Sequence, residues 1–85
     1  MYFVYFAKSV RKHSKVYVGL TSKDPKSRVQ EHNQRSNTWS KQNGPFKLIY
    51  YESFICKEDA KNKEDFYKTG FGKRIKIAIV KEMSP

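Results

Sequence analysis

Hydrophobic residues along the chain gather into three short runs that are separated by polar, basic segments. The runs YFVYFA at 2–7, KVYVGL at 15–20 and FKLIYYESF at 46–54 are rich in aromatic and β-branched residues, which favour strands. The polar segment KSVRKHS joins the first two runs, so we predict an antiparallel hairpin with a long basic loop. The third run has apolar residues on both faces, which predicts a central strand.

A helix is predicted directly after the second strand. Asp24 followed by Pro25 provides an N-cap and a first-turn proline. The helix is expected to run through Arg28 and His32 and to end near Asn33, which we expect to cap it.

Two more helices are predicted in the C-terminal third of the chain. Residues 57–68, KEDAKNKEDFYK, form the first, which is expected to end at Gly70. Residues 72–83, GKRIKIAIVKEM, fit helical spacing and also the alternation of a strand, and we prefer the helix. The polar segment 33–45 is predicted to be a long loop, of a length that is usually functional or disordered.

The predicted order is strand, strand, helix, strand, helix, helix. It defines an α+β fold in which helices flank a three-stranded antiparallel sheet. With 85 residues, the chain is expected to form one domain over residues 1–85.

The charge of the chain indicates its partner. Lys and Arg number 18 against 8 Asp and Glu, and this formal net charge of +10 is typical of chains that bind a polyanion. A membrane surface is the competing polyanion, but no segment approaches the roughly 20 apolar residues of a transmembrane span. Neither a lipid-anchor motif nor a secretory signal is recognisable. We therefore expect a nucleic-acid partner, no membrane and a cytoplasmic location.

The single cysteine, Cys56, agrees with that location. One cysteine excludes an internal disulfide and a multi-cysteine zinc site, and it fits a reducing compartment. We expect Cys56 to be a half-buried small hydrophobic residue.

Four residues near the second strand are placed where a site could form. Period-2 geometry puts Tyr17 and Gly19 on one face of the strand. Arg28 and His32 are four residues apart and share one face of the following helix. Taken singly, Tyr17 is equally well explained by core packing, Arg28 by a solvated helix charge and His32 by a surface position.

Glu64 is unusual because it falls on an apolar stripe. Ala60, Glu64 and Tyr67 are spaced at i, i+4 and i+7, which defines the inward face of the helix over 57–68. A carboxylate there is costly unless it is paired or binds a metal. Lys61 or Lys68 would supply an ordinary ion pair, whereas Mg²⁺ commonly binds one or two carboxylates and takes its other ligands from water and phosphate.

At these residues the sequence resembles the GIY-YIG nuclease family, most closely its small single-domain members. These are similar to the nuclease module of the bacterial excision-repair nuclease and of Holliday-junction and flap nucleases. FVY at 3–5 stands where the family has GIY, and YVG at 17–19 stands where it has YIG. RVQEHN at 28–33 resembles the family's Arg, His and Asn, and NGPFKLIYYESF at 43–54 resembles its third strand. AKNKE at 60–64 matches the spacing that presents the metal-binding glutamate.

Two positions depart from the family pattern. Phe3 replaces the first glycine of GIY, a change that small members tolerate. Leu20 follows YVG where the excision-repair branch has a lysine, so no catalytic lysine is expected there.

The resemblance implies a single-metal, structure-selective endonuclease with a role in DNA repair. Glu64 would hold Mg²⁺ or Mn²⁺, Arg28 would clamp the scissile phosphate, and Tyr17, supported by Tyr5 and His32, would activate water. A tyrosine base has a free pKa about 3 units above neutral pH, a deficit of about 4 kcal/mol. His32, with a free pKa near 6.5, is the rival base.

A second group of residues is expected to bind nucleic acid around the two polar loops. Trp39 would stack on an unpaired base or, equally, act as a hydrophobic plug that holds its loop. Lysines far outnumber arginines, which favours phosphate attraction over base-specific recognition. The predicted contacts are Lys8, Arg11, Lys12, Lys15, Trp39, Lys41 and Lys47.

Three functions are compatible with the sequence. The first is an active endonuclease on DNA or RNA, alone or with a protein partner that targets it. The second is a nucleic-acid-binding module of the same fold with little cleavage activity. The third is a small basic RNA- or ribosome-associated protein, against which the combination of Tyr17, Arg28, His32 and Glu64 argues.

Overall fold

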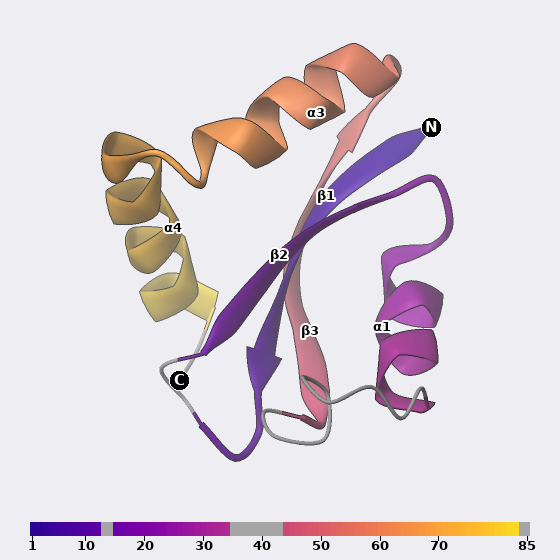
Figure 1. The fold of residues 1–85 in the computed structure, drawn as a ribbon, viewed down its shortest axis with the longest axis vertical. Helices are drawn as coiled ribbons and strands as arrows, with labels where there is room; N and C mark the ends of the chain where they lie inside the picture. The colour runs from indigo at the N-terminus through magenta and orange to yellow at the C-terminus, as the bar shows by residue number, and fades with distance from the viewer. Residues whose placement is uncertain (13–14, 35–43, 84–85) are drawn as a thin grey trace.

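The computed structural model describes residues 1–12, 15–34 and 44–83. These described residues form three strands and three helices in the predicted β-β-α-β-α-α order, which confirms the α+β fold (Figure 1). The elements are β1 (Tyr2–Ser9), β2 (Val16–Thr21), α1 (Pro25–Gln34), β3 (Phe46–Phe54), α3 (Lys57–Phe66) and α4 (Gly70–Met83).

The sheet is antiparallel with the strand order β2-β1-β3. The predicted hairpin of β1 and β2 is therefore confirmed, whereas the prediction that residues 46–54 form the central strand is wrong. β1 is central, with four consecutive buried residues from Val4 to Ala7. β3 lies at one edge of this order because it pairs with β1 on one side, and one of its aromatic residues packs outside the core. Tyr51 is 51% exposed and meets the Phe3 ring edge-on at 5.7 Å.

Helices cover both faces of the sheet. On one face, Val4 and Phe6 of β1 pack against Tyr67, which directly follows α3. On the other face, Tyr5 packs against Val29 of α1. Figure 1 shows the same layers, with α1 on one side of the strands and α3 and α4 on the other.

The two ends of α1 are held by different side chains. The Asp24 carboxylate accepts a hydrogen bond of 3.2 Å from the backbone N–H of Ser27, which confirms the predicted N-cap. At the other end, the Asn33 amide both donates to the carbonyl of Phe46 and accepts from its N–H, each at 2.8 Å. The prediction that Asn33 caps α1 is therefore wrong. Its side chain instead links α1 to β3.

The junction between α3 and α4 differs from the predicted one. α3 ends at Phe66, and Gly70 begins α4 rather than ending α3. The Thr69 hydroxyl donates to the Phe66 carbonyl at 2.7 Å and accepts from the N–H of Gly72 at 3.0 Å, so it caps α4. The predicted helical state of the last segment is confirmed. None of the helices in the described residues is long and apolar enough to cross a membrane.

The expectation for Cys56 is wrong. Its side chain is exposed rather than half-buried. Cys56 occupies the N-cap position of α3 with an extended backbone, at the turn from β3 into the helix. A position at such a turn lies outside the packed faces of both elements, which explains the exposure.

Candidate active site

The two motif tyrosines meet over a glycine. Tyr5 of β1 lies opposite Gly19 of β2, and the rings of Tyr5 and Tyr17 are 6.0 Å apart between centroids. A Cβ added to Gly19 would lie 2.5 Å from the Tyr5 hydroxyl oxygen and 2.7 Å from the Tyr17 ring. Real Cβ atoms do not approach other atoms so closely. Position 19 must therefore be glycine for the Tyr5 and Tyr17 rings to fit beside β2.

α1 brings two more predicted residues to these tyrosines. The His32 ring lies 5.3 Å from the Tyr17 ring between centroids. The Arg28 guanidinium is close enough to Tyr5 to act on its ionisation, both by its charge and by a hydrogen bond. The predicted shared face of Arg28 and His32 therefore turns toward the tyrosine pair.

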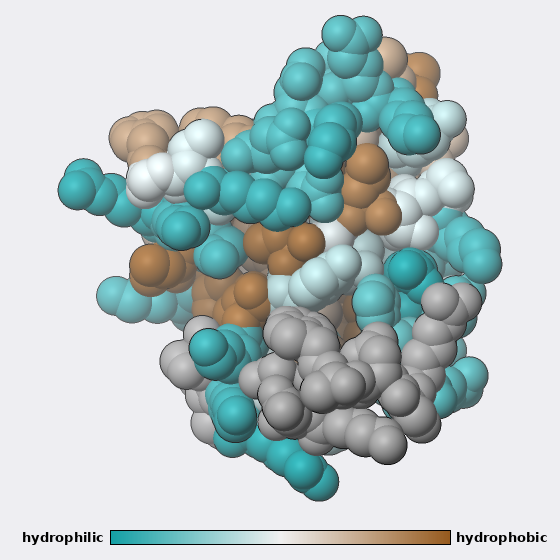
Figure 2. All heavy atoms as spheres, in the orientation of Figure 1, coloured by the Kyte–Doolittle hydropathy of each residue, from teal (hydrophilic) through white to brown (hydrophobic). Residues whose placement is uncertain are grey.

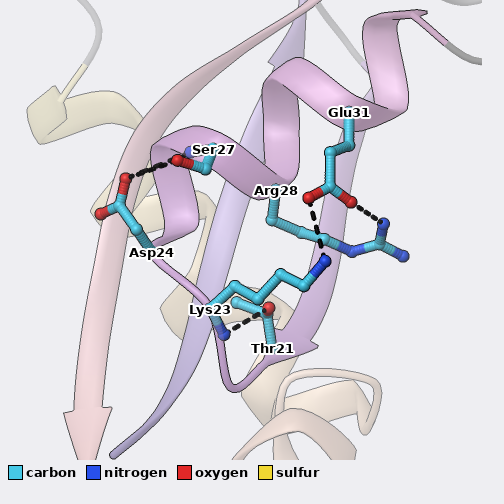
Figure 3. Close-up of polar contacts among 6 residues, drawn as sticks. All are labelled: Thr21, Lys23, Asp24, Ser27, Arg28 and Glu31. Carbon is cyan, nitrogen blue, oxygen red and sulfur yellow. Dashed lines mark hydrogen bonds and ion pairs between the residues drawn. The ribbon is translucent and has the colours of Figure 1, made fainter.

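An acidic residue that the sequence reasoning did not consider holds Arg28. Glu31 Oε2 lies 3.3 Å from Arg28 Nη1, and Glu31 Oε1 lies 3.1 Å from Lys23 Nζ (Figure 3). The hydrogen bond with Lys23 is the main cause that lowers the pKa of Glu31. The contact at Nη1 leaves the remaining guanidinium donors of Arg28 for other acceptors.

The pKa of Tyr5 is raised well above its ordinary value. Burial is the main cause, and the neighbouring Tyr17 hydroxyl and the Glu64 carboxylate add to it. Arg28 opposes the increase. Tyr5 therefore keeps its proton at neutral pH.

Glu64 is partly buried on the inward side of α3, as its spacing predicted. Its side chain is 12% exposed, while Ala60 and Tyr67 on the same stripe are fully buried. Lys61 Nζ lies 3.0 Å from Glu64 Oε1, and Lys68 Nζ lies 3.7 Å from Oε2. Both lysines that the sequence offered as partners therefore pair with the carboxylate.

A pocket of about 260 Å³ opens beside Glu64. Its lining includes Tyr17 and Val18 of β2 and Glu64 and Tyr67 from the other side. The pocket lies at the edge strand β2, and its other lining residues come from α3, the junction after it and α4. A carboxylate and a phenol thus share one solvent-accessible space.

The lining of this pocket offers a divalent cation one carboxylate, that of Glu64, and it also contains three lysines. Within the described ranges, no group of three or more His, Cys, Asp or Glu side chains lies close enough to hold a metal ion. Glu64 would therefore be the single protein ligand, with water and substrate oxygens completing the shell. This is a ligand set that Mg²⁺ accepts, because it retains water and binds phosphate oxygens.

The described members of the predicted nucleic-acid-binding set lie at the end of the sheet nearest the hairpin loop. Lys8 of β1 is opposite Lys47 of β3. Lys8 is half-buried, and Arg11, Lys12, Lys15 and Lys47 are exposed. Trp39, Lys41 and most of the predicted polar loop lie outside the described residues.

Sequence reasoning missed basic residues that lie closer to the candidate site. Lys68, Lys73 and Lys76 line the same pocket as Tyr17 and Glu64. Residues 72–83 fit both helical and strand spacing, so the sequence did not show which of their lysines share a face. With a helix assumed, Lys73 and Lys76 share one face.

A sheet with two tyrosines over one glycine, and an arginine and a glutamate beside them, is the arrangement that the motif resemblance predicted. The family model for the GIY-YIG catalytic domain matches residues 1–76 of this chain. The chain belongs to the GIY-YIG catalytic domain family. Neither the curated proteins nor the solved structures contain a match to it. Membership indicates a nuclease-type function on nucleic acid, in a family of endonucleases that generally depend on a divalent metal.

Proposed function

We propose that the protein is a metal-dependent endonuclease that hydrolyses DNA phosphodiester bonds and selects its substrate by structure rather than by sequence. One observation carries the proposal. Glu64 and Tyr17 line a single pocket, and Glu64, Tyr17 and Arg28 all act electrostatically on Tyr5. This proximity supports the assignment of phosphate binding to Arg28, cation binding to Glu64 and proton transfer to Tyr17.

Arg28 would bind the scissile phosphate. Its side chain is 28% exposed, and its guanidinium is anchored on one side by Glu31. A guanidinium offers paired donors that match phosphate oxygens, and a fixed positive charge stabilises the additional negative charge of the transition state. Glu31 would keep the side chain oriented before the substrate binds.

Tyr17 would accept the proton from the attacking water. It is half-buried beside the pocket, whereas Tyr5 is fully buried and keeps its proton. Tyr5 would support Tyr17 as a hydrogen-bond donor. His32 lies beside Tyr17 and is the competing base, because its free pKa near 6.5 needs no perturbation.

Glu64 would hold Mg²⁺ or Mn²⁺. When bound, the cation would stabilise negative charge on the phosphate oxygens as a Lewis acid. Lys61 and Lys68 neutralise Glu64 in the structure, so they would have to release part of the carboxylate to the cation. Pairs with such exposed lysines contribute at most about 1 kcal/mol each, which makes the exchange feasible.

The same two lysines support a second function. A carboxylate that is already neutralised by lysines needs no metal, so the fold could serve as a nucleic-acid-binding module with little cleavage activity. The alternative predicts strong DNA binding without metal-dependent products.

The test is a cleavage assay with labelled single-stranded, duplex and branched DNA in Mg²⁺, Mn²⁺ or EDTA. The native protein should cleave at least one substrate only with metal, and Glu64→Gln should abolish cleavage while DNA binding persists. Asp65→Asn is the matched control, because Asp65 also pairs with Lys61, at 3.2 Å, but is exposed outside the pocket. Cleavage by Glu64→Gln at the native rate would refute the role of Glu64, and absence of cleavage by the native protein on every substrate would favour the binding module.

A further inference from the structure

The face of α4 that looks toward β2 has an unusual composition. Positions 73, 76, 77, 80 and 81 follow the i, i+3, i+4, i+7, i+8 spacing of a stripe that is usually apolar in a packed helix. Three of these five positions are lysines. The stripe and the start of β2 line a pocket of about 390 Å³, here named the lysine groove, whose lining is Lys15, Val16, Lys73, Lys76, Ile77, Val80 and Lys81.

The four lysines of the groove have no anionic partner in the described part of the chain. None of them forms an ion pair there, although Lys23, Lys61, Lys63 and Lys68 all do. Burial, and secondly the charge of Lys73, lowers the pKa of Lys76. Gathering like charges over apolar surface is unfavourable in the isolated protein, and an anionic partner would reverse that effect.

The groove is continuous with the candidate active site. Val16, Lys73 and Lys76 line both the lysine groove and the pocket that contains Glu64 and Tyr17. From Lys73 to Lys81 the helical rise corresponds to about 12 Å. A polymer that enters the active site would therefore extend along α4 over more than one repeating unit.

We propose that the lysine groove binds an unpaired strand of the DNA substrate next to the scissile phosphate. This inference rests on the proposed nuclease function and names the form of DNA that the site takes. The lysines would contact phosphates, and the apolar floor of Val16, Ile77 and Val80 would contact exposed bases. Figure 2 shows hydrophobic surface bordered by hydrophilic side chains where α4 and the start of β2 lie in Figure 1.

The combination of lysines and an apolar floor selects this occupant over the others. A duplex keeps its bases stacked and paired inside, so it would engage the lysines and leave the floor uncovered. A second copy of this chain in a symmetric contact would bring two lysine clusters together, which opposes association. An unpaired strand satisfies both parts of the surface.

The test compares two double variants of equal charge. Lys73→Gln/Lys76→Gln removes two lysines of the groove, and Lys26→Gln/Lys57→Gln removes two exposed lysines on α1 and α3 that line neither pocket. Binding of fluorescent single-stranded and duplex DNA is measured in EDTA, so that the result does not depend on cleavage. Circular dichroism and melting curves check that both variants are folded.

The groove variant should lose about tenfold in affinity for the single strand, and its slope of log affinity against log salt should fall by about 1.4, at about 0.7 per phosphate contact. The control variant should lose about twofold in affinity for either DNA, and the groove variant should lose about twofold in affinity for duplex DNA. Lys73→Arg/Lys76→Arg keeps the charge and should retain native affinity for both. Equal losses in the two Gln variants, or equal losses on single strand and duplex, would overturn the proposal. So would a groove variant that binds DNA normally but no longer binds phosphatidylglycerol vesicles, since that result assigns the groove to lipid.

Cleavage measured on the same proteins separates this inference from the proposed function. A native protein that binds the single strand through the groove but yields no product in Mg²⁺ or Mn²⁺ refutes the nuclease and keeps the groove. Metal-dependent cleavage together with unchanged single-strand binding in the groove variant keeps the nuclease and refutes the groove.

Discussion

Each face of the sheet carries a pair of tyrosines, and the two pairs differ in the charge beside them. Tyr5 and Tyr17, on the side of α1, lie next to the guanidinium of Arg28. We name them the Arg28 pair. One of its members, Tyr17, borders an open pocket.

The second pair, Tyr50 and Tyr67, lies on the side of α3 around the carboxylate of Glu52. Tyr50 donates a hydrogen bond of 2.8 Å to Glu52 Oε2, and the Tyr67 hydroxyl donates to the same oxygen. Lys63 Nζ lies 3.7 Å from Glu52 Oε1 and 5.4 Å from the centre of the Tyr67 ring. We name these tyrosines the Glu52 pair.

The difference separates a candidate chemical role from a structural one. A carboxylate that accepts a phenol's proton in a hydrogen bond favours the neutral phenol, whereas a nearby cation favours the phenolate. Burial together with Glu52 raises the pKa of Tyr50 to about 12. The Glu52 pair therefore keeps its protons at neutral pH. In the Arg28 pair, Tyr5 also keeps its proton, so Tyr17, which borders the open pocket, is the candidate for proton transfer.

The largest effect should appear in cleavage. Removing the Tyr17 hydroxyl in Tyr17→Phe should lower the single-turnover rate in Mn²⁺ by about 100-fold or more, because positioned proton transfer is worth at least that factor. Tyr50→Phe, from the other pair, should cleave at nearly the native rate. His32→Ala should keep a substantial fraction of activity, and a result in which His32→Ala is the more damaged variant would transfer the base role to His32.

The Glu52 pair should matter more for stability. Tyr67→Phe removes a buried hydrogen bond to a charged acceptor and should lower the free energy of unfolding by about 1.5–3 kcal/mol, measured in urea. Tyr51→Phe on β3 is the control, because Tyr51 is 51% exposed, and it should change stability by less than about 0.5 kcal/mol. Equal stability of the two variants would show that the Glu52 pair does not hold α3 to the sheet.

The glycine under the Arg28 pair should be sensitive to one added methyl group. Gly19→Ala forces a Cβ to within 2.5 Å of Tyr5, which is buried and cannot move aside, so we expect a loss of about 1–3 kcal/mol. Gly70→Ala is the matched control in α4, where an added Cβ meets nothing within 4 Å. It should raise stability by about 0.5–1 kcal/mol, and the two melting temperatures should move in opposite directions. Neutral behaviour of Gly19→Ala would contradict the packing described for the tyrosines.

The smallest effect concerns alkaline pH. The folded-state pKa of Tyr50, about 12, lies above its ordinary value near 10, so folding favours the protonated phenol. This contribution is fully present below about pH 10 and is lost as the pH rises toward 12. Melting temperatures should therefore fall more steeply above pH 10 in the native protein than in Tyr50→Phe, with tyrosinate absorbance followed in parallel. Identical profiles would show that Glu52 does not hold the Tyr50 proton.

Much of the fold was predictable from short-range patterns. The strand runs, the Asp24 cap and the helical stripe that turns Glu64 inward are all confirmed, because each depends on residues a few positions apart. The motif spacing also predicted which side chains would meet, since Tyr5 and Tyr17 lie on paired strands and Arg28 follows on the next helix.

Other features depend on residues that are distant in the sequence. Which strand is central depends on strand pairing. The apolar residues on both faces of β3 suggested that β3 is central, whereas the pairing places β1 there. Asn33 links α1 to β3 because β3 begins beside the end of α1. No local pattern contains that information.

The sequence alone therefore determined the order of the elements, the inward position of Glu64 and the family of the chain. These follow from periodicity and spacing along one segment at a time. Only the tertiary structure decided which charge each tyrosine pair receives and that α4 brings its lysines beside Glu64. Pairing across a sheet and packing of helices determine the electrostatic surroundings of a side chain, and both join segments that the sequence keeps apart.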